Sequence, residues 1–194
     1  MTVEDEDAAL FMKVAAGDKR AFATLFDRHQ NSIVRFAYRF VGSQAKAEEL
    51  AQDIFVKLYK NAKSYRPDAK FKTFMFRVAT NHCLNEVRRP FHKAEAGVAE
   101  VPDTQESAER PDAALEGKAL EKAVHLALDG MSERERAAFC MCRFEGLPYK
   151  EIAAALDASE AAVKSLIHRA TLQVMKQVAQ LKAGLGPAIT RSEA

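Results

Sequence analysis

The chain has 194 residues, with 29 basic and 27 acidic side chains, and 48% of its residues are hydrophobic. This length fits one domain or two small ones and excludes a large multidomain enzyme, and the apolar content is too high for a disordered chain. No stretch approaches the ~20 consecutive apolar residues that a membrane span needs. The acidic start MTVEDEDAAL lacks the basic-then-apolar pattern of a secretion signal, so we expect a cytoplasmic protein without membrane insertion.

Helical periodicity dominates the first part of the chain. Apolar side chains at three- and four-residue steps predict a short first helix that ends at Gly17. Asp18 can cap a second helix, which ends at Gly42, and Ser43 can cap a third. No run alternates with a period of two residues, so no sheet is expected.

A loop and a fourth helix are predicted next. Residues 64–72 contain a proline followed by an aspartate, a combination typical of loops. Apolar spacing then predicts a helix from about Phe74 to Arg89, where Pro90 should stop it.

The charge of this region is strongly basic. Residues 19–93 carry sixteen basic and six acidic side chains, whereas residues 1–18 carry one and five, and residues 94–117 carry one and seven. A basic block between acidic ones indicates a surface that binds a polyanion. From residue 57 to 93 the cations are interleaved with aromatic residues, which suits single-stranded nucleic acid because cations hold phosphates while rings stack on bases. The alternative is a solvated basic face over an aromatic core.

Residues 92–112, HKAEAGVAEVPDTQESAERPD, interrupt the helical pattern. They contain two prolines, six acidic residues and no aromatic residue, a composition typical of a flexible linker. We therefore predict an all-α chain with two small helical domains, residues 1–91 and 113–182, joined by this linker and mobile relative to each other. Residues 183–194 should form a frayed tail.

The second domain shows clear helix signals. Ser132 and Glu135 fit the S-x-x-E capping box of a helix start. A short helix is predicted over residues 149–156, and Ser159 can cap a longer one that runs to about Leu181.

The pattern of residues 149–170 predicts a helix-turn-helix. Short and cationic side chains on the outer face of its second helix suit the DNA major groove. Lys164 and Arg169 can bond phosphates or guanine edges, and Glu160 can accept a hydrogen bond from cytosine. An ordinary helical hairpin is the alternative interpretation.

The three cysteines carry no recognisable site pattern. Cys83 stands alone, and Cys140 and Cys142 form a C-x-C on an expected helix, which is neither a disulfide framework nor a zinc spacing. We interpret them as structural thiols and expect no metal and no cofactor, with a redox or metal role for Cys140 and Cys142 as the alternative.

Six segments in order resemble one known family, the extracytoplasmic-function (ECF) group of bacterial RNA polymerase sigma factors. They are GDKRAFATLFDRH (17–29), AEELAQDIFVKLY (47–59), FKTFMFRVATNHCLNEVRR (71–89), SERERAAF (132–139), EGLPYKEIAAALD (145–157) and VKSLIHRA (163–170). The resemblance implies an alternative sigma factor, not an enzyme, that directs promoter recognition, DNA melting and transcription initiation at a specific regulon. Its domains would be sigma region 2 and sigma region 4.

The resemblance also implies partners and residues. The helix matching residues 47–59 would dock on the clamp coiled coil of the largest polymerase subunit, the second domain would meet the polymerase flap, and an anti-sigma factor is an expected partner. The docking candidates are Glu48, Glu49, Gln52, Asp53, Phe55 and Leu58. An internal core position is the alternative for Phe55.

In similar proteins the loop matching residues 64–72 and the following helix capture the melted strand of the minus-ten element, with one base flipped into a pocket. The candidates here are Tyr65, Arg66, Asp68, Lys70, Phe71, Lys72, Phe74, Arg77, Asn81, Asn85, Arg88 and Arg89. The helix-turn-helix would read the minus-thirty-five element as duplex through Tyr149, Lys150, Ser159, Glu160, Ala161, Lys164, Ser165, His168 and Arg169.

The recognition helix departs from the family pattern. Ala161-Ala162 replaces the usual Gly-Thr and Leu166 an arginine, which removes possible DNA contacts, and Asp157 stands where glycine is usual. Two other interpretations remain open: a sigma mimic that binds only an anti-sigma factor, and a helical enzyme or redox sensor built around the cysteines with His82 or His125.

Overall fold

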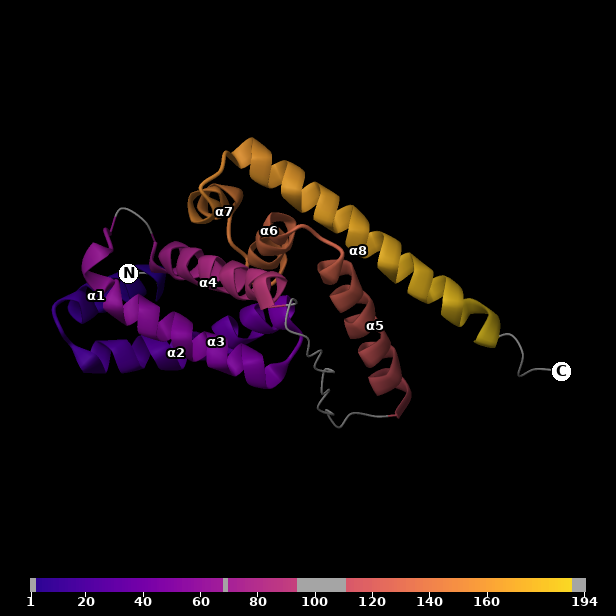
Figure 1. The fold of residues 1–194 in the computed structure, drawn as a ribbon, viewed down its shortest axis with the longest axis horizontal. Helices are drawn as coiled ribbons and strands as arrows, with labels where there is room; N and C mark the ends of the chain where they lie inside the picture. Colours follow the sequence, from indigo (N-terminus) through magenta and orange to yellow (C-terminus); the bar gives the residue numbers. More distant parts are fainter. Residues whose placement is uncertain (1–2, 68–69, 94–110, 190–194) are drawn as a thin grey trace.

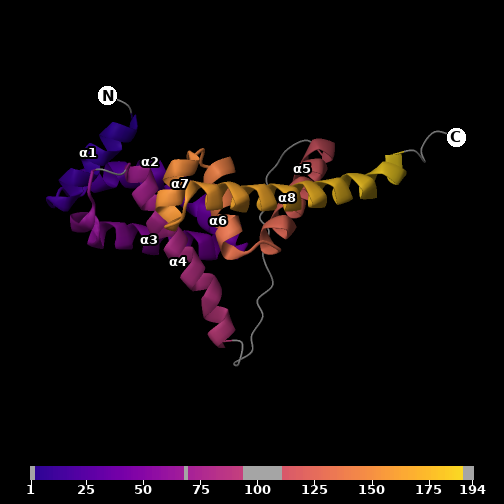
Figure 2. The same ribbon diagram turned by 90° about the horizontal axis from the view of Figure 1, so that it is seen from above.

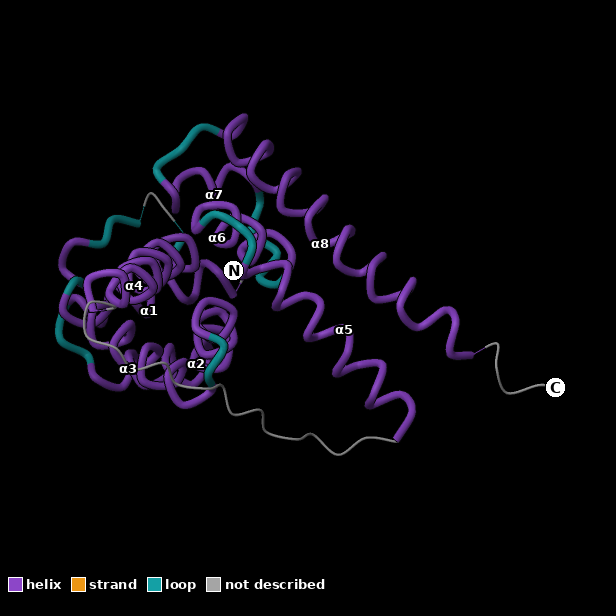
Figure 3. Tube along the Cα trace, turned by 45° about the vertical axis from the view of Figure 1, so that its right-hand side comes forward, coloured by secondary structure: helices purple, strands orange, loops and turns teal. Residues whose placement is uncertain are grey.

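The computed structural model describes residues 3–67, 70–93 and 111–189, and within these the chain forms helices without strands (Figure 3). The all-α fold class is thus confirmed. The first module contains α1 (Val3–Ala15), α2 (Lys19–Val41), α3 (Gln44–Lys60), the short 3-10 helix η1 (Ala62–Ser64) and α4 (Phe71–Lys93). The second contains α5 (Pro111–Asp129), α6 (Glu133–Arg143), α7 (Tyr149–Leu156) and α8 (Glu160–Ile189).

The capping residues of the first module lie where the sequence predicts them. Asp18 accepts hydrogen bonds from the backbone N–H groups of Arg20 (2.8 Å) and Ala21 (3.1 Å) at the start of α2. Gly42 ends this helix in the left-handed conformation, with φ of 68°, which glycine adopts at little steric cost. Ser43 then caps α3.

The second module confirms the predicted capping box and turn. The hydroxyl of Ser132 accepts from the backbone N–H of Glu135 (3.4 Å), whose carboxylate accepts in return from the backbone N–H of Ser132 (3.0 Å). The turn between α7 and α8 passes through Asp157 with φ of 49°, and Ser159 caps α8 by accepting from Ala162 N–H at 3.1 Å.

Two predicted helix ends are wrong. The helix α4 continues past Pro90 to Lys93, and α8 continues past Leu181 and Pro187 to Ile189. A proline lacks the N–H that would bond the carbonyl four residues earlier. Close to a helix end that loss is confined to the last turns.

The core of the first module is aromatic and aliphatic. Phe36, Ile33 and Ile54 are fully buried where α2 packs along α3. Phe11 of α1 closes one end, with its ring centroid 4.7 Å from Phe71 and 5.2 Å from Tyr65. The rings of Phe11, Tyr65 and Phe71 therefore pack together beneath the basic stretch of residues 57–93.

The two modules are packed together, which differs from the expectation that they are mobile relative to each other. α4 lies between α3 on one side and α6 and α7 on the other (Figure 1), and one hydrophobic core runs through both modules. Arg136 of α6, only 8% exposed, donates a hydrogen bond to the carbonyl of Phe40 in α2 at 3.1 Å. Buried surfaces of both modules hold them together. Of the predicted linker, residues 94–110 lie outside the described part.

The helices α5 and α8 pack along each other in roughly opposite directions and project beyond the first module (Figure 2). Across the described ranges no helix combines the length and apolarity needed to cross a bilayer.

Candidate nucleic-acid interface

A pocket of about 350 Å³ opens beside the loop that precedes α4. Arg66 from the loop and Arg77 from α4 are exposed at its edge, and the guanidinium of Arg77 lies 5.3 Å from the ring centroid of Phe74. The lining residues are Ser64, Tyr65, Arg66, Thr73, Phe74, Arg77 and Ala154. Two cations beside an apolar floor can hold a phosphate and receive a flat base.

The predicted aromatic residues form the floor of this pocket and the core beneath it. Tyr65 and Phe74 are each 6% exposed and Phe71 is 1% exposed. The ring of Phe71 packs against Phe11 and His29. The alternative interpretation from the sequence, a solvated basic face over an aromatic core, therefore describes much of this region. Tyr65 and Phe74 therefore expose little surface on which a base could stack.

Polar side chains continue from the pocket along one face of α4. Arg77, Asn81, Asn85 and Arg88 are all exposed and are spaced by four, four and three residues, so they form one stripe on the helix. Amides at this spacing suit base edges, and the arginines suit phosphates. Of the other predicted residues, Asp68 and the side chain of Arg89 lie outside the described part.

Three of the predicted cations are already occupied by the second module. Lys70 pairs with Glu151 at 2.6 Å, and Lys72 donates to the backbone carbonyl of Glu145 at 2.6 Å. Arg88 forms two hydrogen bonds to one carboxylate, that of Glu133. Glu133, Glu145 and Glu151 lie in segments that resemble the family, but sequence reasoning did not predict their contacts with these three cations.

The helix-turn-helix is assembled as predicted. Ile152 of α7 and Val163 and Ile167 of α8 are at most 2% exposed in the seam between the helices, and the predicted contact set from Tyr149 to Arg169 is exposed throughout. This exposed face leaves the recognition helix accessible to a duplex.

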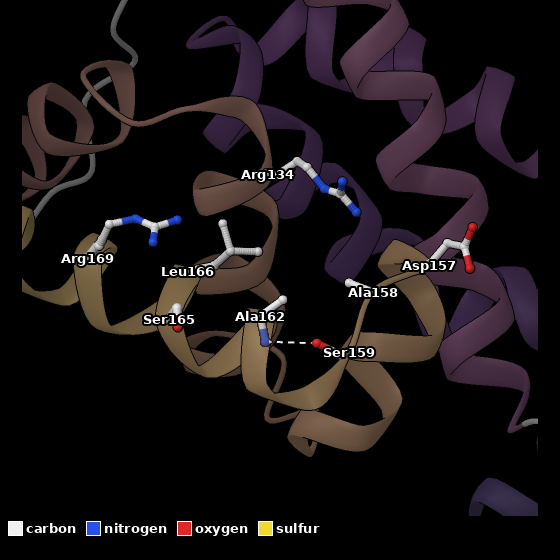
Figure 4. A pocket seen from close by; sticks show the side chains of 8 residues that line it. All are labelled: Arg134, Asp157, Ala158, Ser159, Ala162, Ser165, Leu166 and Arg169. Carbon is white, nitrogen blue, oxygen red and sulfur yellow. Dashed lines mark hydrogen bonds between the residues drawn. The ribbon is translucent and has the colours of Figure 1, made fainter.

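A second pocket, of about 390 Å³, lies at the start of α8 (Figure 4). Its lining residues are Arg134, Asp157, Ala158, Ser159, Ala162, Ser165, Leu166 and Arg169. Glu135 holds Arg169 in an ion pair at 2.5 Å. Although burial opposes its ionisation, hydrogen bonds from Arg169 and Ser132 lower the pKa of Glu135. The first turn of α8 and the two arginines supply positive charge to this pocket, but Asp157 in its lining and the carboxylate of Glu135 offset that charge.

The predicted polymerase-docking helix α3 presents an acidic face. Glu48 and Gln52 are exposed, and the carboxylates of Glu49 and Asp53 are 62% and 58% exposed. Phe55 and Leu58 are instead buried at 3% and 1%, so the core alternative for Phe55 holds in this structure. The exposed apolar side chains on this helix are Val56 and Tyr59, which sequence reasoning missed because the apolar period also fits the core.

The described residues hold no cluster of three or more histidine, cysteine or acidic side chains that could bind a metal. Burial raises the pKa of Cys83 to about 12, with a contribution from Cys140, and burial likewise raises the pKa of Cys140 to about 12. Both thiols are fully buried core groups, Cys83 in α4 and Cys140 in α6. Burial also lowers the pKa of His82.

These features define a two-module, helical, DNA-binding protein with a pocketed basic surface and a separate helix-turn-helix. Residues 25–90 match the family model for sigma-70 region 2, and residues 121–174 match that for sigma-70 region 4. The chain belongs to the sigma-70 family and, within it, to the ECF RNA polymerase sigma factors. It is an alternative sigma factor, and its function is to direct transcription initiation at promoters.

The similarity extends over nearly the whole chain. The chain is 31% identical over 189 residues to the RNA polymerase sigma-H factor of Pseudomonas aeruginosa, and the match covers 93% of this chain and 98% of the relative. It is 31% identical over 180 residues to the ECF RNA polymerase sigma factor SigE of Mycolicibacterium smegmatis, covering 91% and 70%. The fold matches the sigma factor RpoE of Bartonella quintana, solved with the anti-sigma factor NepR, with a TM-score of 0.65, 18% identity and coverage of 81% and 96%.

Proposed function

We propose a division of labour in which the first module binds polymerase and the melted minus-ten strand while the second reads the minus-thirty-five duplex. The observation that carries this proposal is the pocket between Arg66 and Arg77, which continues into the polar stripe of α4. A melted strand needs both features: a hollow for an unpaired base and a line of groups for the backbone.

The pocket would receive one flipped base. Flipping costs a few kcal/mol, which pocket contacts must offset. Arg66 and Arg77 supply charge at the edge, while Asn81 and Asn85 lie one turn apart on the exposed face and can hydrogen-bond base edges. Arg88 would hold the backbone further along.

Polymerase docking is assigned to the outer face of α3. Glu49, Gln52 and Asp53 offer carboxylate and amide groups that pair with arginines of a partner coiled coil. Val56, 48% exposed, and Tyr59, 40% exposed, replace Phe55 and Leu58 as the apolar centre of this surface, since interfaces draw most of their energy from such anchors.

The second module would place the start of α8 in the major groove of the minus-thirty-five element. Lys164 and His168 lie one turn apart on its exposed face. The chain itself would carry no enzymatic activity, would act in the cytoplasm, and would meet the polymerase flap and an anti-sigma factor, as the sigma factor RpoE of Bartonella quintana meets NepR.

Run-off transcription with core RNA polymerase on a promoter library tests this assignment. We expect Arg77→Ala to lower the yield of selective transcripts about tenfold, the factor that corresponds to ~1.4 kcal/mol of lost contact energy. Arg20→Ala removes one charge from an exposed position of α2 and should keep the full yield. Equal yields from the two variants would contradict the pocket assignment, and a wild-type protein without selective transcripts would overturn the proposal.

A further inference from the structure

The recognition helix α8 carries a single arginine, Arg169, and the cation before it on the same helix is Lys164. Both side chains can bond a guanine edge. Only a guanidinium, however, presents parallel N–H groups in a rigid fork that matches O6 and N7 of guanine. Arg169 is therefore the side chain of this helix best suited to select a guanine.

The guanidinium of Arg169 is held from the neighbouring helix α6. Its Nε donates a hydrogen bond to Oε1 of Glu135 at 2.5 Å. No described residue accepts a hydrogen bond from its two Nη groups, and the side chain is 57% exposed. One edge of the fork is thus fixed by the protein, while the Nη groups stay available to a duplex.

Glu135 is itself fixed by the start of α6. Its second carboxylate oxygen accepts from the backbone N–H of Ser132 at 3.0 Å and from the Ser132 hydroxyl at 2.8 Å. The side chain is only 16% exposed. Burial opposes its charge, but hydrogen bonds from Arg169 and Ser132 lower the pKa of Glu135. An ionised carboxylate held by the capping box therefore anchors the arginine.

Such an anchor affects which part of DNA the arginine can contact. A free arginine has many rotamers, and ordering it on binding costs free energy that a side chain already held does not lose again. A mobile guanidinium can also turn to a phosphate, which carries no sequence information. Fixing the guanidinium therefore favours base selection over backbone contact.

A purely structural tie between the two helices explains less of this geometry. α6 already packs against α8, and both helices contribute apolar side chains to one core. Arg169 instead keeps most of its surface exposed, in the row of α8 side chains that lines the pocket at the start of this helix (Figure 4). An exposed end on a buried anchor is the arrangement of a binding group with a supporting residue behind it.

We propose that Glu135 is a positioning residue that orients Arg169 to select a guanine in the minus-thirty-five duplex. This inference rests on the proposed function of α8. Glu135 acts through Arg169 and makes no DNA contact of its own. The sequence shows Glu135 only as half of a capping box, so its second role has no local signal.

The test uses holoenzyme assembled from core RNA polymerase and the full-length chain. Selection from duplexes randomised over the minus-thirty-five element, by the wild type and by Arg169→Ala, identifies the guanine that depends on Arg169. Two labelled duplexes then carry a G·C or an A·T pair at that position. We expect the wild type to prefer the G·C duplex about tenfold and Glu135→Ala to prefer it less than about threefold, with little change in affinity for the A·T duplex.

Matched variants separate positioning from helix stability. Ser132→Ala removes the other half of the capping box but keeps the contact between Glu135 and Arg169, so the tenfold preference should remain. Glu135→Gln still offers an oxygen to Nε and should restore most of the preference. The double variant Glu135→Ala/Arg169→Ala should select no less strongly than Arg169→Ala alone, because Glu135 acts through Arg169.

The outcomes distinguish this inference from the function on which it rests. A wild-type preference in Glu135→Ala, an equal loss of affinity for both duplexes, or an unchanged selected sequence in Arg169→Ala would overturn the positioning role and leave the assignment of α8 intact. Wild-type holoenzyme that selects no sequence would overturn that assignment and the inference with it. Should Glu135→Ala be unstable, Arg169→Lys keeps the charge but removes the Nε contact, and a full guanine preference in this variant would also overturn the proposal.

Discussion

At the scale of single residues, the cysteine thiols divide by burial. Cys83 and Cys140 are fully buried with pKa values raised to about 12, whereas Cys142 is partly exposed. The thiolate is the reactive form of cysteine, so burial both blocks the access of a reagent and reduces the fraction of thiolate. We expect an aromatic disulfide reagent at neutral pH to modify one thiol per native chain quickly and two only slowly.

Substitution identifies that thiol. Cys142→Ser should abolish the fast phase, while Cys83→Ser should leave it intact. Fast modification of all three thiols in the native protein would contradict this burial pattern and would revive a redox role for the C-x-C pair.

His82 makes stability depend on pH. Burial and the nearby charge of Lys57 outweigh the carboxylate of Asp53, which lies 3.5 Å from Nε2, and lower the pKa of His82 below its ordinary 6.5. The unfolded chain therefore binds this proton more readily than the folded one, so the stabilisation is complete above about pH 6.5 and is lost as the pH falls through the folded-state pKa.

Urea unfolding at pH 7.5 and 5.5 measures this effect. We expect His82→Gln to reduce the loss of unfolding free energy between the two pH values. The control, His168→Gln, changes an exposed position of α8 and should leave the loss unchanged. An undiminished loss in His82→Gln would show that other groups set the pH dependence.

At the scale of elements, the capping box that starts α6 is a local source of stability. Ser132 and Glu135 satisfy each other's backbone N–H groups, which would otherwise lack partners at the helix start. Ser132→Ala should lower the free energy of unfolding by about 1 kcal/mol. In the control, Ser165→Ala removes only a hydroxyl that bonds the Ala161 carbonyl within α8 and should change it by less than ~0.5 kcal/mol.

The two halves of α8 should differ in DNA binding. Lys164 lies on the recognition face, whereas Lys176 lies three turns further along the same helix, and both are exposed. With a labelled promoter duplex, we expect Lys164→Ala to weaken binding and to reduce the salt slope by about one phosphate contact. Lys176→Ala, which removes the same charge, should do neither; equal effects would contradict the placement of the recognition helix.

Elements of this kind could be predicted from sequence because their causes are local. Asp18, Gly42, Ser43 and Ser132 act within a few residues of themselves, so their capping roles are readable from spacing. The roles of the apolar residues on α3 could not be predicted in this way, because the same helical spacing of apolar residues fits both a buried core face and an exposed docking face. Phe55 faces inward while Val56 faces outward, and only the packing of α2 decides between them.

At the scale of the whole molecule, the contact between modules has no local sequence signal. Lys72 meets Glu145 at a separation of 73 residues, and Thr73 meets Glu151 at 78. The charge blocks show that the first half is basic, but they do not say which acids it meets. An acidic, proline-containing linker favours independent modules by composition, and long-range complementarity overrides that preference.

Arg136 ties the two modules together, and its removal should separate their unfolding. Its guanidinium donates to the carbonyl of Phe40, one of the carbonyls that the end of α2 leaves without a helical partner. It also lies 3.4 Å from Asp129. Because a buried acceptor without a donor costs about 1–3 kcal/mol, Arg136→Ala should lower the free energy of unfolding by that amount.

Calorimetry of the full chain shows whether this contact couples the modules. With one shared core, the wild type should unfold in a single transition, whereas Arg136→Ala should unfold in two, the second module at the lower temperature. Arg143→Ala, at an exposed position of the same helix, should keep the single transition. Two transitions already present in the wild type would show that the modules fold independently, because a buried guanidinium that joins them must make the stability of each depend on the other.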